Sequence, residues 1–532
     1  MVALVPPLDD DSPSIFEPMN VIKSIYSTIL LIFSTSLIMG LIFTSQTKVA
    51  YEFNPAMAFI TIWVCTIWLT MIEGSQASIV GLQNIDRETY KLSHPYSYKC
   101  SAIAHKGDNL KRYLLGRQFM VVLVVFAINN AGHPLADAEL WGLPSIVKTI
   151  FLSSGLAMIF FTVMIGQLSS EVNASLCMLD YINNVFAVMT VYVALALEFS
   201  GILHGAYLIQ MIVCKCAGKE IDTEEPPRTD FENFFFFARV MFSIGVLIFA
   251  FAVTLTALFG GQTTVWEGIP PAVAVIIFFL LMSVVGLLEA TQISYFAVAK
   301  LKAEDRGTNI FARKSCDVLF KGEGTQQGCV NLPGYMIGRQ LCVVSCMFFV
   351  ARVTSLDIKP GEPTMFGVSD GTQKFFNTGL LGAHIVTIVA SIAWRLAGQA
   401  FPIFFLSTPP AFVFLKICMG LEASGVCSGA WVLGWIHRKI ARYQQDEIYI
   451  GSAEDRAEAE QKEVEKKKRI AEYAPPALKE LMYEDPTIGH TIHTLRRWIR
   501  DSAPSELRAL MMSDPTVRDY VYSIERVKGA NN

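Results

Sequence analysis

Ten long apolar runs along the first 440 residues restrict this chain to a small set of folds. Each run approaches or exceeds the roughly 20 residues that a helix needs to cross about 30 Å of hydrocarbon. A segment in lipid must satisfy its own backbone hydrogen bonds, so these runs predict helices. We therefore expect an all-α membrane protein with ten transmembrane helices, at residues 25–45, 54–82, 114–132, 146–168, 185–213, 234–259, 270–299, 336–352, 378–401 and 409–437.

The composition agrees with a chain that is embedded in a lipid bilayer. Hydrophobic residues make up 52% of it and charged residues 17%, which is too apolar for a soluble protein of this length. A net charge of −4 gives no basic surface, so we expect no nucleic-acid partner. The start, MVALVPPLDDD, has neither a basic segment nor an early apolar core, so we expect no cleaved signal peptide.

The eleven cysteines are scattered, mostly in predicted helices, and none has metal-ligand spacing. Cys214 and Cys216 lie too close together for a C-x-x-C motif. We interpret most of the cysteines as small apolar side chains packed among helices. Cys316 and Cys329 share one polar loop and could form a disulfide if that loop faces an oxidising space.

The first half of the chain recurs in the second half at a nearly constant separation. Gln46-Thr47 matches Gln262-Thr263, and Glu73 with Gln76 matches Glu289 with Gln292, both at an offset of 216 (262 − 46 = 289 − 73). Longer motifs recur at offsets of 222 and 224. Each copy holds five helices, an odd number, so the copies must have opposite orientations in the membrane. Such inverted repeats are typical of secondary transporters.

The repeat defines the expected domain boundaries. A cytosolic N-terminal segment, 1–24, precedes the first five-helix repeat at 25–214, and a polar linker at 215–233 leads to the second repeat at 234–440. Residues 441–532 form a cytosolic tail. Basic residues after the second and tenth helices place both termini in the cytoplasm, although the basic loop at 300–321 then lies outside, against the positive-inside rule.

Two carboxylates interrupt otherwise apolar helices at equivalent positions of the repeats. Glu73 and Gln76 lie three residues apart on one stripe of the second helix, and Glu289 and Gln292 repeat this pattern in the seventh. A carboxylate inside a membrane is costly, so it usually faces a partner or a water-filled cavity and is a functional candidate. The alternative is a polar helix end that reaches water.

Further polar residues recur at the third and eighth helices and at the fifth and tenth. Arg117 and Arg339 each stand before a glutamine, Gln118 or Gln340, whose amide both donates and accepts hydrogen bonds. The arginines could instead extend to the lipid headgroups. For the intramembrane pair of glutamates in the fifth and tenth helices, a structural anchor and an ion or proton site remain equal alternatives: Glu198 and Glu422.

These motifs resemble a known family. The pairs Glu73-Gly74-Ser75-Gln76 with Gly116-Arg117-Gln118, and Glu289-Ala290-Thr291-Gln292 with Gly338-Arg339-Gln340, resemble the doubled EGxQ and GRQ signature of diatom silicic acid transporters. Cys177-Met178-Leu179-Asp180 is similar to the CMLD tetrapeptide of the same family. Ala290 departs from the glycine of the second EGxQ.

The resemblance implies sodium-coupled uptake of silicic acid across the plasma membrane. Whether the protein also serves intracellular vesicle membranes stays open. Silicic acid is a small neutral tetra-alcohol, which suits the glutamine amides, and sodium is a hard cation that prefers oxygen ligands. Sodium would be the coupling ion, with no other cofactor. The expected roles are substrate binding by Gln76, Gln118, Gln292 and Gln340, sodium binding by Glu73, Ser75, Glu289 and Thr291, and gating or orientation by Arg117 and Arg339.

The tail contains a charged segment at 453–473 that predicts a solvated helix. The alternative is a contact through the tail, either a short coiled coil with a protein partner or self-association. After it, Pro475 to Thr487 recurs at an offset of 29 as Pro504 to Thr516. Each copy ends in Asp-Pro-Thr, which is typical of a helix N-terminus with proline in the first turn. This small repeat suggests a docking or regulatory contact.

Other function classes fit the sequence less well. The chain contains no G-x-x-x-x-G-K-[ST] motif, which argues against an ATP-driven pump. It contains neither H-E-x-x-H nor G-x-S-x-G, so we do not expect an enzyme. A carrier or channel for another neutral hydroxylated solute such as boric acid, and a membrane sensor that signals through its tail, remain alternatives.

Overall fold

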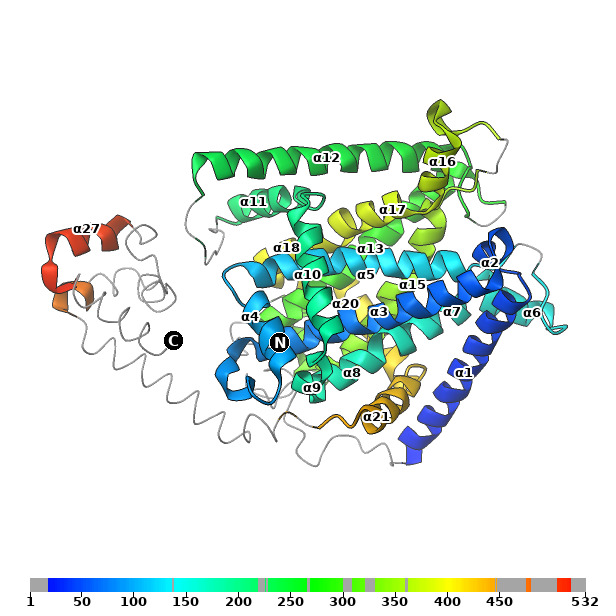
Figure 1. Cartoon of the computed structure of the whole chain (residues 1–532), viewed down its shortest axis with the longest axis horizontal. Helices are drawn as coiled ribbons and strands as arrows, with labels where there is room; N and C mark the ends of the chain where they lie inside the picture. The colour runs from blue at the N-terminus through cyan, green and yellow to red at the C-terminus, as the bar shows by residue number, and fades with distance from the viewer. Residues whose placement is uncertain are drawn as a thin grey trace. The chain divides into compact units, whose positions relative to one another are not determined.

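The computed structural model describes residues 18–135, 138–218, 225, 228–265, 268–299, 309–320, 331–358, 362–444, 446, 475–479 and 505–517. Within these ranges the regular secondary structure is helical (Figure 1). Eight of the described helices are long and apolar enough to cross a membrane. The chain forms two compact units: residues 1–105, 109–220 and 236–446 make the first, and residues 106–108, 221–235 and 447–532 make the second.

The helices of the first half are α1 (Pro18–Phe43), α2 (Lys48–Glu52), α3 (Pro55–Gly81), α4 (Pro95–Ala104), α5 (Asn109–Gly132), α6 (Ser145–Val147), α7 (Leu156–Phe161), α8 (Ser169–Leu176), α9 (Met178–Ile182), α10 (Val185–Phe199) and α11 (Gly205–Ala217). Those of the second half are α12 (Asp230–Phe259), α13 (Pro271–Ala299), α14 (Ile310–Leu319), α15 (Leu332–Thr354), α16 (Asp370–Asn377), α17 (Leu380–Ile385), α18 (Ala393–Ala400), α19 (Pro402–Leu406), α20 (Pro409–Ala423) and α21 (Gly429–Ala441). Short 3₁₀ turns occupy Leu82–Asn84, Arg87–Tyr90 and Met365–Gly367, and π-helical segments occupy Lys148–Ser153, Thr162–Leu168 and Val386–Ile392.

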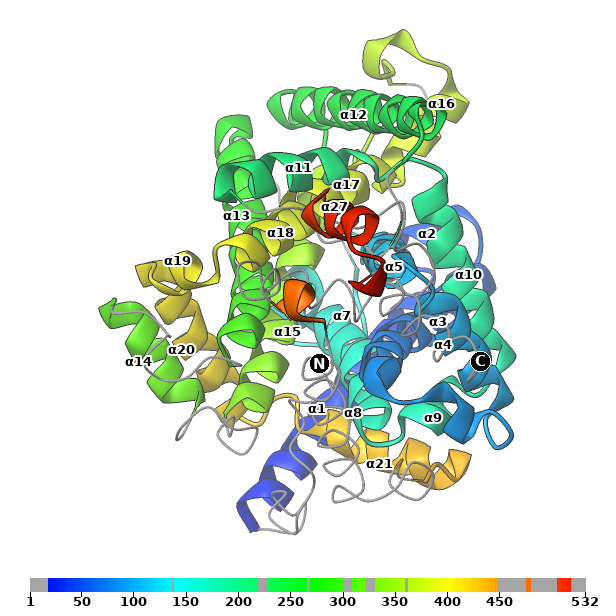
Figure 2. The same cartoon turned by 90° about the vertical axis from the view of Figure 1, so that its left-hand side faces the viewer.

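The first compact unit has its core around α5, α15 and the helices that follow each of them. In the most apolar part of α5, 72% of residues are buried, against 28% in α3 and 33% in α12, so the latter two present apolar side chains outward, as lipid-facing helices do. Helices α3, α4, α9 and α10 lie on one side of this unit and α13, α14, α19 and α20 on the other (Figure 2). A residue of α5 or α15 is therefore placed between the two halves of the chain.

The two halves share structural details at the offsets that the sequence predicts. Isolated β-bridges pair Thr47 with Pro134 and Thr263 with Leu356. Gly116 in α5 and Gly338 in α15 each face a backbone carbonyl of the helix beside them, on α10 and α20 respectively, so closely that a Cβ atom would collide with the carbonyl oxygen. Two copies of one helix crossing are therefore built in the same way.

Gly338→Ala is expected to destabilise the protein by about 3 kcal/mol, because the added methyl group meets rigid backbone that cannot move aside. The thermal unfolding midpoint of the detergent-solubilised protein measures this. Gly420→Ala in α20 is the matched control, since nothing lies within 4 Å of its Cβ position. Equal midpoints for the two variants would contradict the expectation.

A hydrogen bond joins the first helix of each half to the turn before the last helix of the other half. The Ser27 hydroxyl of α1 donates to the Val426 carbonyl beside α21, and the equivalent Ser243 of α12 donates to the Ile202 carbonyl beside α11, at 2.6 Å for the latter. Figure 1 shows α1 next to α21 and α11 next to α12. Each first helix therefore has a contact with the other half of the chain.

Three predicted spans differ from the structure. The fifth and tenth are not continuous helices, because Gly201 and Gly425 adopt positive φ and each run divides into two helices, α10 with α11 and α20 with α21. The fourth membrane-length helix spans 156–176 instead of 146–168, because Gly155 has a φ of 78° and separates the first part of the run from α7. A glycine without a Cβ permits such a turn inside an apolar run.

The second compact unit includes the one-turn helix at 476–479 and α27 (Ser505–Ser513). Leu478 and Leu507, equivalent in the small repeat, are both fully buried. The predicted cap of the second copy is confirmed, because the Asp514 carboxylate accepts the Thr516 N–H at 2.8 Å. The charged segment 453–473, the first-copy cap at Asp485 and the pairing of Cys316 with Cys329 lie partly or wholly outside the described residues.

Candidate functional site

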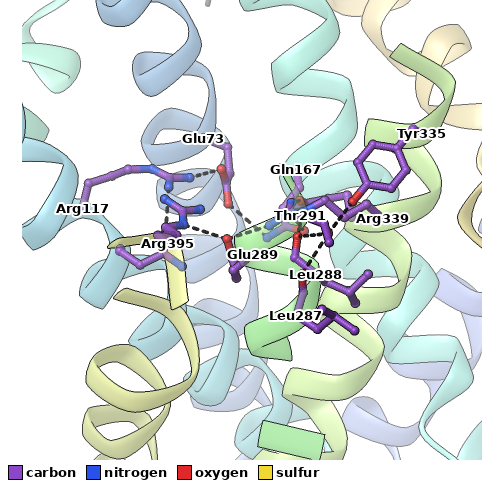
Figure 3. A network of polar contacts seen from close by, with 12 residues as sticks. Glu73, Arg117, Gln167, Leu287, Leu288, Glu289, Thr291, Tyr335, Arg339 and Arg395 are labelled. Carbon is purple, nitrogen blue, oxygen red and sulfur yellow. Dashed lines mark hydrogen bonds and ion pairs between the residues drawn. The ribbon is translucent and has the colours of Figure 1, made fainter. Parts of the chain in front are cut away.

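A buried network of ionised and amide side chains lies between α3, α5, α13, α15 and α18 (Figure 3). In the first half, the Arg117 guanidinium of α5 donates to Glu73 Oε2 of α3, and both side chains are buried. Gln167 Nε2, from the π-helical segment before α8, donates to Glu73 Oε1 at 3.1 Å. Glu73 therefore has one arginine and one neutral amide as partners.

The second half repeats this pair and adds a second arginine. Arg339 Nη2 of α15 lies 2.7 Å from Glu289 Oε2 of α13, and Arg395 Nε of α18 donates to the same oxygen at 2.7 Å. Arg339 Nε also donates to the Leu288 carbonyl at 3.1 Å. Charge-assisted hydrogen bonds of this kind are what make a buried carboxylate tolerable.

One hydrogen bond joins the two ion pairs across the halves. Gln340 Nε2 donates to Gln167 Oε1 at 3.0 Å, while Gln340 Oε1 accepts from Arg339 Nη1 at 3.0 Å. The chain of contacts therefore runs from Glu73 through two glutamines to Arg339 and Glu289. It is a path of hydrogen-bond donors and acceptors between two buried carboxylates.

This geometry excludes one of the alternatives that the sequence left open for each of four charged residues. Glu73 and Glu289 are 4% and 1% exposed, so neither is a polar helix end that reaches water. Arg117 and Arg339 are 3% and 2% exposed, so neither extends to the headgroups. Each GRQ motif lies inside its helix, at least six residues after the first residue (Asn109 or Leu332), whereas the predicted spans 114–132 and 336–352 put it in the first turn.

Of the other predicted site residues, Gln118 and Thr291 join this network through described contacts, Gln118 with Arg117 and Thr291 with the Leu288 carbonyl that Arg339 also contacts. The Ser75 hydroxyl lies 3.3 Å from the Met71 sulfur, and the Thr291 hydroxyl donates to the Leu287 carbonyl and lies 2.9 Å from the Tyr335 hydroxyl. Gln118 is buried and accepts from Arg117 at 3.1 Å. Gln76 and Gln292 differ in burial: Gln76 is half-buried, whereas Gln292 is 5% exposed, and its Oε1 has no hydrogen-bond partner among the described residues.

The glutamates of the fifth and tenth predicted spans lie at the turns that divide these spans. Glu198 is buried and accepts from the Tyr207 hydroxyl at 2.7 Å, a bond that joins α10 to α11 across the Gly201 turn. Glu422 is partly exposed and lies beside Gly334. Among the described contacts, neither touches the central network, which favours the structural interpretation of Glu198.

Sequence reasoning missed two members of the network, Gln167 and Arg395. An arginine inside the predicted ninth span was a detectable signal, because an ionised residue in an apolar run is a functional candidate by default. Gln167 gave a weaker signal, since it stands near the end of the predicted fourth span. Only the corrected fourth helix places it at mid-span.

The CMLD segment, residues 177–180, contacts the part of the chain that follows α21. The Asp446 carboxylate, beyond α21, accepts the N–H groups of Met178 and Leu179 at 2.7 and 2.9 Å. Asp180 accepts the Gln444 N–H at 2.7 Å and lies 3.1 Å from His94 Nε2. Burial raises the pKa of the Cys177 thiol to about 12, which favours its protonated form.

Asp446→Ala is expected to destabilise the protein by about 1–2 kcal/mol, because two helix N-terminal N–H groups lose their acceptor. The unfolding midpoint in detergent measures this, with the exposed Glu52→Ala as control. A midpoint equal to that of the control would show that the contact contributes no stability.

The fold and the site define a polytopic helical membrane protein with a buried ion-pair network at the interface of two related halves. The sequence model of the silicon transporter family matches residues 15–486. The chain belongs to the silicon transporter family, so it is a membrane transporter of silicic acid. Comparison with curated proteins and with solved structures finds no match.

Proposed function

We propose that the protein is a sodium-coupled symporter that moves silicic acid across the plasma membrane by alternating access. The observation that supports this most directly is the hydrogen bond between Gln167 and Gln340, which connects a buried ion pair of one half to that of the other. A site shared by two halves can open to either side when one half moves against the other.

The proposed topology has ten crossings in two inverted five-helix repeats, with both termini in the cytoplasm. Eight described helices have membrane-spanning length, and the remaining two crossings would each consist of a helix pair, α10 with α11 and α20 with α21. The matching bridges, glycine contacts and ion pairs of the halves support the duplication.

Silicic acid is neutral and carries four hydroxyl groups, each a donor and an acceptor. The amides of Gln167 and Gln340 have the same dual character, and they bond to each other in this structure. A substrate between them would replace one amide–amide bond with two bonds of its own. Gln118, Gln76 and Gln292 would extend this site, and the unpaired Gln292 Oε1 can accept a substrate hydroxyl.

Uphill transport of a neutral solute needs a coupled ion. The carboxylates of Glu73 and Glu289 are the oxygen ligands that sodium prefers, and Arg117 and Arg339 would orient them. The two arginines would also balance the negative charge of the buried carboxylates when no ion is bound.

Uptake of radiolabelled germanic or silicic acid into liposomes that contain the purified protein tests this function. Accumulation that depends on an inward sodium gradient is expected. Flux that ignores the gradient would replace the symporter with a channel or uniporter. Binding without flux by folded protein would favour a sensor, and flux of boric acid alone would change the substrate.

A further inference from the structure

The fourth membrane helices of the two halves correspond at an offset of 224 residues. Each contains a π-helical segment, Thr162–Leu168 in the first half and Val386–Ile392 in the second. Single π-helical turns inside α-helices are frequent at functional sites. At this offset Gln167 of the first half is equivalent to Ser391 of the second half (391 − 167 = 224).

In the first half, the Gln167 amide satisfies two polar partners at once. Its Nε2 donates to Glu73 Oε1 at 3.1 Å, and its Oε1 accepts from Gln340 Nε2 at 3.0 Å. The π-helical segment that carries Gln167 lies against α3 and α15, the helices of these two partners. One side chain therefore connects the carboxylate of its own half to the amide of the other half.

In the second half, the equivalent partners are present but the connecting side chain is not. The segment that carries Ser391 lies against α13 and α5, the helices of Glu289 and Gln118. A serine side chain is too short to make both bonds of a glutamine. The Ser391 hydroxyl is fully buried and has no hydrogen-bond partner.

The described contacts of the two partners leave the matching atoms unused. Glu289 is held by arginines through its Oε2, and Gln118 accepts from Arg117 through its Oε1. No described hydrogen bond reaches Glu289 Oε1 or Gln118 Nε2, the atoms whose counterparts contact Gln167 in the first half. One acceptor, one donor and one hydroxyl are therefore available at this position.

This set of groups defines the chemistry of the missing partner. Buried polar groups are nearly always hydrogen-bonded, so an unpaired set calls for a molecule that completes it. That molecule must donate to a carboxylate, accept from an amide and bond to a hydroxyl. Silicic acid is neutral, and each of its four hydroxyls both donates and accepts. Its tetrahedral shape directs these hydroxyls toward several groups at once.

The second ion pair also has accessible surface beside it. The side chain of Arg395 is 21% exposed, against 3% for Arg117 and Arg339. Because Arg395 donates to Glu289 at 2.7 Å, this accessible surface lies next to the Glu289 carboxylate. The described hydrogen bond of Arg395 uses Nε, and its Nη groups are further donors for a solute hydroxyl.

We infer that silicic acid binds in the place of the amide that Ser391 lacks, where its hydroxyls contact Glu289, Gln118 and the Ser391 hydroxyl. The inference rests on the proposed function. To the position between Gln167 and Gln340 it adds a second position, related to the first by the repeat. The second position accepts the substrate without breaking a bond of the protein.

Ser391→Gln tests this position, because it supplies the amide that the first half already has. The glutamine should bond to Glu289 and Gln118, and the unfolding midpoint in detergent should be at or above that of the wild type. Uptake of silicic acid by the variant in liposomes should fall at least about tenfold, because the place of the solute is filled. Wild-type uptake by the folded variant would overturn the inference and leave the position to an ordered water molecule.

Ser391→Leu is the matched control for the size of the glutamine. Leucine fills a similar volume but forms no hydrogen bonds with Glu289 and Gln118, so its unfolding midpoint should be lower than that of Ser391→Gln. Equal midpoints would show that the glutamine amide makes no bonds at this place, and would count against the inference.

Ser391→Ala removes the hydroxyl alone and provides a second arm if the larger side chains do not fold. The substrate KM should rise about two- to tenfold, the value of one neutral hydrogen bond, while the half-saturating sodium concentration stays unchanged. Ser345→Ala in α15 is the control, since the Ser345 hydroxyl already donates to the Leu341 carbonyl at 2.7 Å. A wild-type KM in Ser391→Ala would contradict the inference.

The outcomes separate this inference from the proposed function. Wild-type uptake that ignores sodium would remove the symport and leave the position at Ser391 standing. Sodium-driven uptake that the Ser391 variants do not alter would remove the position alone. Folded wild-type protein that does not take up silicic acid would remove both.

Discussion

Arg117→Met is expected to reduce the stability of the protein by about 3–5 kcal/mol, because it leaves the Glu73 carboxylate buried without a cationic partner. Glu73 is 4% exposed, so water cannot replace the lost guanidinium. Gln167 still donates one hydrogen bond, but a neutral amide does not balance the charge. A large drop of the unfolding midpoint in detergent is the expected measurement.

A double variant separates the charge from the packing. Glu73→Leu combined with Arg117→Met removes both charges and should recover most of the lost stability, since apolar replacements of a buried ion pair are often neutral or stabilising. Uptake should be absent in the double variant, because both members of the ion pair are missing. The ion pair between Lys148 and Glu139 at the surface provides the control. Lys148→Met should change stability by about 0–1 kcal/mol, since Glu139 is left in water. A single variant as stable as the double would show that Glu73 is not held by its charge partner.

Gln340→Leu is expected to lower silicic acid uptake by at least about tenfold while folded protein still reaches the membrane. The leucine removes the only described bond between Gln167 and the second half, and with it an amide that would contact substrate hydroxyls. The loss of affinity arises because neighbouring polar atoms stay unpaired when substrate binds beside an apolar side chain. Initial uptake rates, normalised to the amount of protein in the membrane, measure the effect.

Gln83→Leu is the matched control for this variant. Gln83 lies just beyond the end of α3, on the stripe that also carries Glu73 and Gln76, but it is exposed. Its replacement should leave uptake within about twofold of the wild type, since an exposed amide keeps its hydrogen bonds to water. Unchanged uptake in Gln340→Leu would exclude the amide bridge from the transport pathway, and equal losses in both variants would indicate a nonspecific effect.

The sequence predicted those helices best whose ends carry local signals. The predicted span 54–82 is α3 at Pro55–Gly81, where the Asn54 side chain caps the helix before a proline, and the predicted span 270–299 is α13 at Pro271–Ala299. Hydropathy did not predict the helix ends where a glycine turn divides a run that is apolar on both sides of the turn. Gly201, Gly425 and Gly155 turn the chain inside lipid-compatible sequence, and a glycine can equally well lie in a continuous helix.

The sequence also indicated the two ion pairs of the site. The repeated EGxQ and GRQ motifs identified Glu73 with Arg117 and Glu289 with Arg339 as candidates, and the structure brings both pairs into contact. The sodium assignment of Ser75 and Thr291 stays a prediction. The described partner of the Ser75 hydroxyl lies in its own helix, and those of the Thr291 hydroxyl include its own helix and Tyr335. A residue's place on a helical stripe predicts its face but not its partner across the interface.

By itself, the sequence determined that this is a duplicated helical membrane protein of the silicon transporter family, because apolar length, a constant offset and local motifs are all properties of the linear chain. The tertiary structure alone decided which charges meet. Gln167 reaches Gln340 from 173 positions away, and Arg395 reaches Glu289 from another helix. Such pairings depend on how helices pack, and packing brings together residues that no spacing in the sequence relates.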